Sequence, residues 1–101
     1  MENDGNIIFH SEAFAELEQA HTWYEEQAPG IGGLFFQEVQ YAIAGIYENP
    51  EAWPAYSHGT RRFLLHRFPY AVVYRVQSTK VQVCAVMHLK RKPGYWTRRK
   101  F

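Results

Sequence analysis

The second half of the chain carries the side chains best suited to chemistry on a phosphate group. His88, Arg91 and Tyr95 lie close together in the sequence. An imidazole titrates near neutral pH, so His88 can act as a general base or a general acid. Arg91 can bind a phosphate through two parallel hydrogen bonds and stabilise the charge that develops during cleavage. With Arg61 and Arg75 as further phosphate ligands and Tyr95 or Trp96 stacked on a base, metal-free cleavage of RNA is chemically possible.

Cationic and aromatic side chains could instead bind a target without cleaving it. The candidate target-binding residues are Arg61, Arg62, Arg75, Lys90, Trp96, Arg98 and Arg99. Purely structural roles are the alternative. His88 can bond a backbone carbonyl at a strand end, and Arg75 can pair with a helix carboxylate. Tyr95 and Trp96 can form a lid over a sheet edge, and residues 98–100 can be a solvated tail. The residue types leave these alternatives open.

The sequence argues against a metal centre. No Asp or Glu follows Glu51, although Mg²⁺ and Mn²⁺ sites rely on carboxylate oxygens. The five histidines show no zinc-like spacing, and the chain has one cysteine. We therefore expect neither a metal nor another cofactor.

The net charge of +1 hides a division of charge between the two halves of the chain. All ten acidic residues lie between Glu2 and Glu51, and all eleven basic residues lie between Arg61 and Lys100. This asymmetry favours a polyanionic or acidic partner for the basic half, or compensation between helix carboxylates and strand arginines. Six basic residues fall within residues 90–100. Pairing between helix carboxylates and strand arginines does not easily account for this cluster in the tail.

Composition predicts one small domain spanning residues 1–101. Of its residues, 47% are hydrophobic, enough for a single core. The lone Cys84 lies in a predicted strand, which fits a reducing compartment. The chain has no charged-then-apolar leader and no apolar run near 18 residues. We expect a cytoplasmic protein that does not bind membranes.

The candidate residues must be positioned by a sheet formed from residues 61–88. Alternating apolar runs predict three antiparallel strands, with Ser78 and Thr79 as a two-residue turn. This register places Tyr74 opposite Val83, Val72 opposite Ala85 and Tyr70 opposite Met87 on one apolar face. The opposite face carries Arg75 and His88 and is expected to be uncovered.

The first half of the chain is predicted to cover the apolar face. A strand over residues 6–10 precedes a helix over 11–28 that Ser11 caps, and a second helix spans 34–48. A glycine-rich turn at residues 30–33 joins the helices, and a connector with Trp53 and Tyr56 follows. Residues 89–101 form a basic, aromatic tail. The order β-α-α-β-β-β predicts an α+β fold, a helical hairpin on one face of a mostly antiparallel sheet.

Two long motifs resemble the RelE/ParE toxin superfamily. They are RRFLLHRFPYAVVYRV, and VQVCAVMHLKRKPGYW followed two residues later by Arg, with FHSEA opening the helical pair. The resemblance covers nearly the whole chain. It implies the RelE/ParE-like fold, the role of toxin in a type II toxin–antitoxin system of the plasmid-stabilisation kind, and a cognate antitoxin as partner. A homodimer or a heterotetramer with the antitoxin is also implied.

The superfamily divides by target. RelE-like members cleave mRNA on the ribosome without metal, whereas ParE-like members are similar in fold and poison DNA gyrase. By resemblance, Arg91 matches a RelE-like catalytic arginine, and Tyr95 lies near a RelE-like tyrosine. Ala71 stands where RelE-like toxins carry an arginine, and the His88–Arg91 pattern is similar to ParE-like chains. The resemblance therefore favours gyrase, with mRNA cleavage by His88, Arg91 and Tyr95, or an inactive toxin-like binding module, as alternatives.

Overall fold

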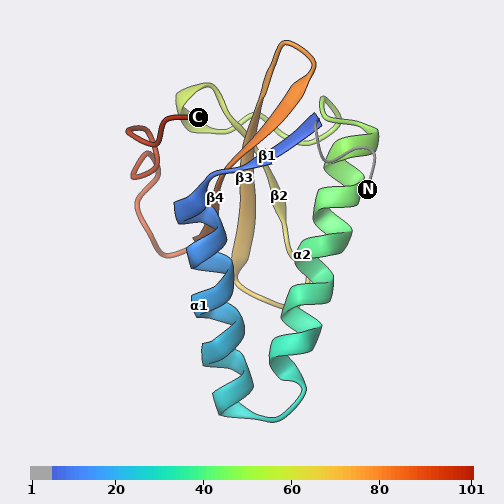
Figure 1. Ribbon diagram of the computed structural model, residues 1–101, viewed down its shortest axis with the longest axis vertical. Helices are drawn as coiled ribbons and strands as arrows, with labels where there is room; N and C mark the ends of the chain where they lie inside the picture. The colour runs from blue at the N-terminus through green and yellow to red at the C-terminus, as the bar shows by residue number, and fades with distance from the viewer. Residues whose placement is uncertain (1–5) are drawn as a thin grey trace.

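Two helices pack on one face of a four-stranded mixed sheet. The computed structural model describes residues 6–101, so the first five residues of the predicted 1–101 domain lie outside the description. The elements are β1 (Ile7–Phe9), α1 (Ser11–Gln27), α2 (Ile31–Glu48), the 3₁₀ turn η2 (Ser57–Gly59), β2 (Arg61–Leu64), β3 (Tyr70–Gln77) and β4 (Lys80–His88). The sheet order is β1-β4-β3-β2, and only the β1–β4 pair is parallel. The predicted α+β fold is confirmed (Figure 1).

Helix α1 turns its small and aliphatic residues toward the sheet, as the sequence predicted. Ala13, Leu17 and Ala20 are its buried residues. The N-cap is His10, whose Nδ1 accepts a hydrogen bond from the backbone N–H of Glu12 at 3.0 Å. The prediction of Ser11 as the cap was therefore wrong by one residue, because an imidazole nitrogen can take the role of a capping oxygen.

The turn between the helices is tighter than predicted. Helix α2 begins at Ile31, not Leu34, because Gly30 adopts a left-handed conformation with φ 90° and turns the chain at once. The Glu25 carboxylate accepts hydrogen bonds from the N–H groups of Gly30 (2.8 Å) and Gly32 (3.0 Å). These bonds satisfy N–H groups that would otherwise be unpaired at the start of α2, and they lower the pKa of Glu25.

A bulge in β4 changes the predicted register. Tyr74 pairs with Val83 as expected, but the next pair joins Val73 to Ala85, so Cys84 is an extra residue on β4. Beyond it Tyr70 pairs with His88, and the predicted Tyr70–Met87 pairing was wrong.

The bulge also exchanges the faces of the residues that follow it. Val86 packs in the helix-covered core, whereas Ala85 and Met87 pack on the opposite face. His88 lies beside Tyr70 and faces α1. The prediction that His88 shares a face with Arg75 was therefore wrong.

The second face of the sheet is covered rather than open. Its buried residues are Ala71, Val73, Cys84, Ala85 and Met87, and Trp96 closes over them with 3% of its surface exposed. Tyr56 from the connector stacks on Trp96, with ring centroids 5.7 Å apart. The predicted uncovered face was wrong, because residues 89–101, here named the C-terminal strap, fold back across the sheet.

Candidate functional site

A buried carboxylate on α1 holds the C-terminal strap. Glu16 Oε2 accepts hydrogen bonds from Arg99 Nη2 at 2.9 Å and Arg91 Nη1 at 3.3 Å. Glu16 Oε1 accepts from Arg99 Nη1 at 3.1 Å and from the backbone N–H of Val86 at 2.9 Å. Only 13% of the Glu16 side chain and 10% of the Arg99 side chain are exposed. Glu16, Arg91 and Arg99 are called the strap anchor below.

The anchor forms because β1 is short. Strand β1 pairs with β4 only along residues 81–83, with one further bond from the His10 N–H to Val83 O. Within residues 6–101, the edge of β4 beyond that point has no neighbouring strand. Arg99 Nη1 donates to Cys84 O at 3.0 Å, and Glu16 takes the Val86 N–H. Charged side chains thus complete hydrogen bonds that a longer strand would have made.

Tyr95 lies beneath both arginines of the anchor. The Arg91 guanidinium carbon is 3.5 Å from the centroid of the Tyr95 ring, and that of Arg99 is 5.1 Å away. The Tyr95 hydroxyl is buried and has no hydrogen-bond partner within residues 6–101. Burial raises the pKa of Tyr95 well above its ordinary value, and the nearby Glu16 charge raises it further. A proton on this hydroxyl is therefore held firmly.

His88 and Arg91 share a hollow beside α1, with a volume of about 240 Å³, which Glu16 and Trp23 also line. His88 Nδ1 accepts a hydrogen bond from the backbone N–H of Lys90 at 3.1 Å. A neutral His88 therefore carries its proton on Nε2. His88 and Arg91 line this hollow and Tyr95 packs under Arg91, so the three predicted catalytic residues lie close together. Arg91 is already paired with Glu16, however, and the Tyr95 hydroxyl is enclosed.

The predicted target-binding residues do not form one platform. Arg61 donates to Trp53 O at 2.7 Å, and the Arg62 guanidinium lies 4.2 Å over the Tyr56 ring. Both belong to β2, the edge strand of the sheet on the side opposite β1. Arg75 Nε donates to Gln82 Oε1 at 2.7 Å.

The remaining predicted residues belong to the strap, and they differ in exposure. Trp96 and the Arg99 side chain are buried, so neither can meet a partner in this conformation. Lys90 and Arg98 are exposed. The interpretation of residues 98–100 as a solvated tail was wrong for Arg99, which anchors the strap.

An apolar groove between the two helices was missed by sequence reasoning. Its wider part has a volume of about 520 Å³ and is floored by Ile7, Phe9, Leu17 and Val39. Phe14, Phe36 and Tyr47 stand at its sides with 47%, 39% and 36% of their surfaces exposed. The signal was the presence of large aromatic residues beside the apolar stripes of both helices.

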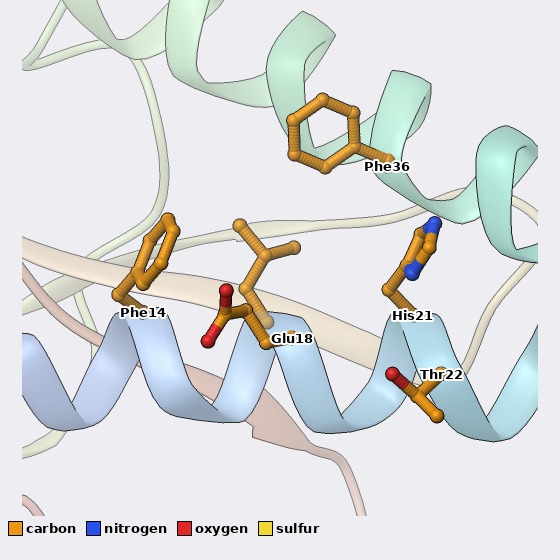
Figure 2. A pocket seen from close by; sticks show the side chains of 6 residues that line it. Phe14, Glu18, His21, Thr22 and Phe36 are labelled. Atoms are coloured by element: carbon orange, nitrogen blue, oxygen red, sulfur yellow. The ribbon is translucent and has the colours of Figure 1, made fainter.

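Figure 2 shows the narrower end of this helical groove. Phe14 and His21 project from α1 toward α2, and Phe36 comes from α2 opposite them. The His21 and Phe36 rings meet edge to face at 6.4 Å. Glu18 and Thr22 form a polar margin along α1. An exposed apolar groove with a polar margin is typical of a surface that binds another protein.

Two searches of the described residues had negative outcomes. No group of three or more His, Cys, Asp or Glu residues within 6–101 could hold a metal ion. Among the helices formed by these residues, none is long and apolar enough to cross a membrane.

The fold, two helices on one face of a four-stranded mixed sheet, has a solved counterpart. A solved structure described as the chromosomal ParDE TA system from P. aeruginosa matches with a TM-score of 0.74 and 17% identity. The match covers 84% of this chain and 96% of the other. The family model described as ParE toxin of type II toxin-antitoxin system, parDE, matches residues 7–93. The chain therefore belongs to the ParE toxin family, which confirms the predicted resemblance. The search of curated proteins found no match.

Proposed function

We propose that this toxin inhibits growth by binding and poisoning DNA gyrase. The observation that carries the proposal is the ParE family match across residues 7–93. The strap anchor supports it, because Glu16 binds both terminal nitrogens of Arg99 and one of Arg91, which leaves fewer donors for the phosphate that a nuclease must hold. We further propose that the toxin acts in the cytoplasm, where gyrase works and where a buried free thiol such as Cys84 persists.

The exposed strap cations are the proposed contacts with the target. Lys90 and Arg98 are exposed on the strap. Arg61, Arg75, Trp96 and Arg99 instead hold the connector, the sheet and the strap together. The proposed role of these four residues is to position the strap. Only the solvent-facing side chains, Lys90 and Arg98, can contact a partner while the strap stays folded.

The test is inhibition of DNA supercoiling by purified gyrase. Wild-type toxin is expected to block supercoiling and to raise the amount of gyrase-cleaved DNA. Lys90→Gln combined with Arg98→Gln is expected to weaken inhibition, whereas Gln77→Glu at the exposed β3–β4 end is not. Full gyrase activity at saturating, folded toxin would overturn the proposal.

Cleavage of mRNA is the second candidate, because His88 and Arg91 line one hollow. Primer extension on mRNA after toxin induction distinguishes it. New codon-positioned ends that disappear in His88→Ala would establish the ribosome as target. Under the gyrase proposal, His88→Ala keeps its growth inhibition and no such ends form.

The helical groove is the proposed binding site of the antitoxin. Its apolar floor and the exposed Phe14, Phe36 and Tyr47 suit an amphipathic helix with apolar residues three and four apart. Phe14→Ser with Phe36→Ser is expected to weaken capture of co-expressed antitoxin at least about tenfold, since two aromatic anchors are lost. Tyr41→Ser, also on α2 but outside the groove and 72% exposed, is the matched control.

The assembly of the pair is a separate measurement. We propose that toxin and antitoxin form a heterotetramer, and a toxin homodimer is the alternative. Light scattering gives the mass of the purified assembly and distinguishes the two. If Phe14→Ser with Phe36→Ser captures antitoxin as well as wild type does, the helical groove is not the antitoxin site and the strap side is the remaining candidate.

A further inference from the structure

The strap closes a small polar cavity against the second face of the sheet. Its volume is about 60 Å³, and it is lined by His58, Thr60, Arg75, Trp96, Thr97 and Arg99, with Cys84 at its floor. Strap, connector and sheet each contribute to this wall. No carboxylate is among these lining residues. The cavity is therefore bordered by hydrogen-bond donors and positive charge.

An indole N–H in this cavity wall lacks an acceptor. Trp96 is 3% exposed, and its Nε1 has no hydrogen-bond partner within residues 6–101. The ring is held in place by stacking on Tyr56 and by an edge contact with Tyr95 at 5.4 Å. A buried donor without an acceptor is unfavourable, so the fold retains a group whose natural complement is a bound oxygen atom.

Two guanidinium groups direct positive charge into the same space. Arg75 donates one hydrogen bond, from its Nε to Gln82, and its guanidinium carbon lies 5.5 Å from the centroid of the Phe101 ring. Its terminal nitrogens make no hydrogen bond within the described residues. Arg99 donates to Cys84 O beside the cavity. Burial raises the pKa of the Cys84 thiol, and the charges of Arg75 and Arg99 oppose that rise, which places both cations near the cavity floor. Glu16 neutralises Arg99 from the far side, so Arg75 supplies the uncompensated charge.

We propose that this cavity binds one tetrahedral oxyanion of the phosphate class. The terminal nitrogens of Arg75 can hold two of its oxygens, and the Trp96 N–H can donate to a third. A space of about 60 Å³ corresponds to roughly two water molecules, which suits a single small anion and excludes a nucleoside. The bound anion would join strap to sheet. The inference is independent of whether gyrase is the target.

The indole N–H signals of the full-length toxin provide the test. The chain has three tryptophans, Trp23, Trp53 and Trp96, so a ¹H–¹⁵N spectrum carries an internal comparison. Trp96→Phe identifies the signal of interest. Inorganic phosphate, added against chloride at constant ionic strength, is expected to shift the Trp96 signal along a saturating curve and to leave the other two in place. Absence of a selective shift both at about 10 mM phosphate, ten times a millimolar Kd, and with the 5′-phosphorylated oligonucleotide described below would overturn the proposal.

Matched variants separate the cavity from general charge attraction. Arg75→Gln is expected to weaken phosphate binding at least about tenfold, because it removes a bidentate charged donor. Arg98→Gln removes an exposed strap cation outside the cavity and is expected to leave binding unchanged. Arg75→Lys keeps the charge and should bind more weakly than wild type but better than Arg75→Gln. Equal losses in Arg75→Gln and Arg98→Gln, with both spectra folded, would also overturn the proposal.

The phosphate could be a free ion or part of a nucleic acid. A short oligonucleotide with a 5′-phosphate is compared with the same oligonucleotide lacking it. A Trp96 shift that requires the terminal phosphate assigns the site to nucleic acid ends, whereas a shift with inorganic phosphate alone assigns it to the free ion. Either result supports an oxyanion site, whereas the absence of a Trp96 shift with both ligands contradicts it.

Discussion

Replacing Glu16 by Ala tests the strap anchor directly. The change leaves the Arg99 guanidinium, with a side chain 10% exposed, with only the exposed Glu12 carboxylate at 3.6 Å, and it leaves the Val86 N–H unpaired. Removing one partner of a buried ion pair typically costs about 3–5 kcal/mol. Arg91 is 52% exposed and can be hydrated again, so its share is small. We expect the free energy of unfolding to fall by about 3 kcal/mol. At about 4–8 °C per kcal/mol, the melting temperature should fall by about 12–24 °C.

Urea unfolding followed by circular dichroism measures this loss. Glu16→Gln keeps the shape and one acceptor oxygen and should lose less than Glu16→Ala. Glu26→Gln, exposed on the same helix, is the control and should stay within about 0.5 kcal/mol of wild type.

Coupling to Arg99 provides the second criterion. Because the cost arises from an unpaired buried cation, adding Arg99→Leu to Glu16→Ala should recover part of the loss, and the two changes should not be additive. Trypsin should also cut the strap faster in Glu16→Ala, since its cleavage sites lose their anchor. A loss below about 0.5 kcal/mol, or full additivity with Arg99→Leu, would refute the anchor.

Three further predictions test the turn and the core. Gly32→Ala should destabilise the fold by about 1–3 kcal/mol in thermal unfolding, because its Cβ would lie 2.6 Å from His21 O, whereas Gly33→Ala has open space and should stabilise it by about 0.5–1 kcal/mol. The hydrogen bond from the Gly30 N–H lowers the pKa of Glu25 in the folded state below its ordinary value of 4.5. The stability that the ionised Glu25 carboxylate contributes is therefore present above pH 4.5 and is lost as the pH falls through the folded pKa. The stability difference between wild type and Glu25→Gln should therefore vanish in acid, and a constant difference would contradict the cause. Burial raises the pKa of Tyr74 from 10.0 to about 12, so stability is complete below pH 10 and is lost as pH rises toward 12, a loss that Tyr74→Phe should reduce in alkaline unfolding curves.

The sequence predicted the elements whose signal is local. The apolar stripe of α1, with Ala13 and Leu17, appears as a 3.6-residue period, and the alternating runs of β3 and β4 mark the hairpin. Residues 61–88 formed the predicted antiparallel strands. Helix boundaries moved where a side chain replaced a backbone contact, as Glu25 did at the start of α2. Such caps depend on the position of a carboxylate in space, which periodicity does not encode.

The sequence did not predict which face each strap or β4 residue occupies. The bulge at Cys84 adds a single residue, and every later side chain of β4 changes face. Valines and alanines fit either face, so the apolar pattern after Cys84 is compatible with both registers. His88 was therefore placed on the wrong side. For Trp96 the sequence offered a lid over a sheet edge as one alternative, but it did not predict burial in a core, because proline and glycine just before it predict an irregular tail.

The division of charge between the halves of the chain has two physical parts. Compensation accounts for one, because Arg67 pairs with Glu38 at 2.7 Å and Arg99 with Glu16 at 2.9 Å across the helix–sheet boundary. The Glu16, Glu38 and Arg99 side chains are at most 15% exposed in these pairs, whereas Arg67 is 61% exposed. Each pair cancels charge that would otherwise attract a distant partner. The second part is the exposed charge, which lies on the strap at Lys90, Lys92, Arg98 and Lys100. A partner attracted to those cations contacts a segment whose position depends on the Glu16 carboxylate. Binding that keeps the anchor intact adds to strap order, whereas binding that draws Arg99 outward must break a buried ion pair. Target affinity and strap stability are thus linked through one acidic side chain of the helical half, and a Glu16 variant should change both.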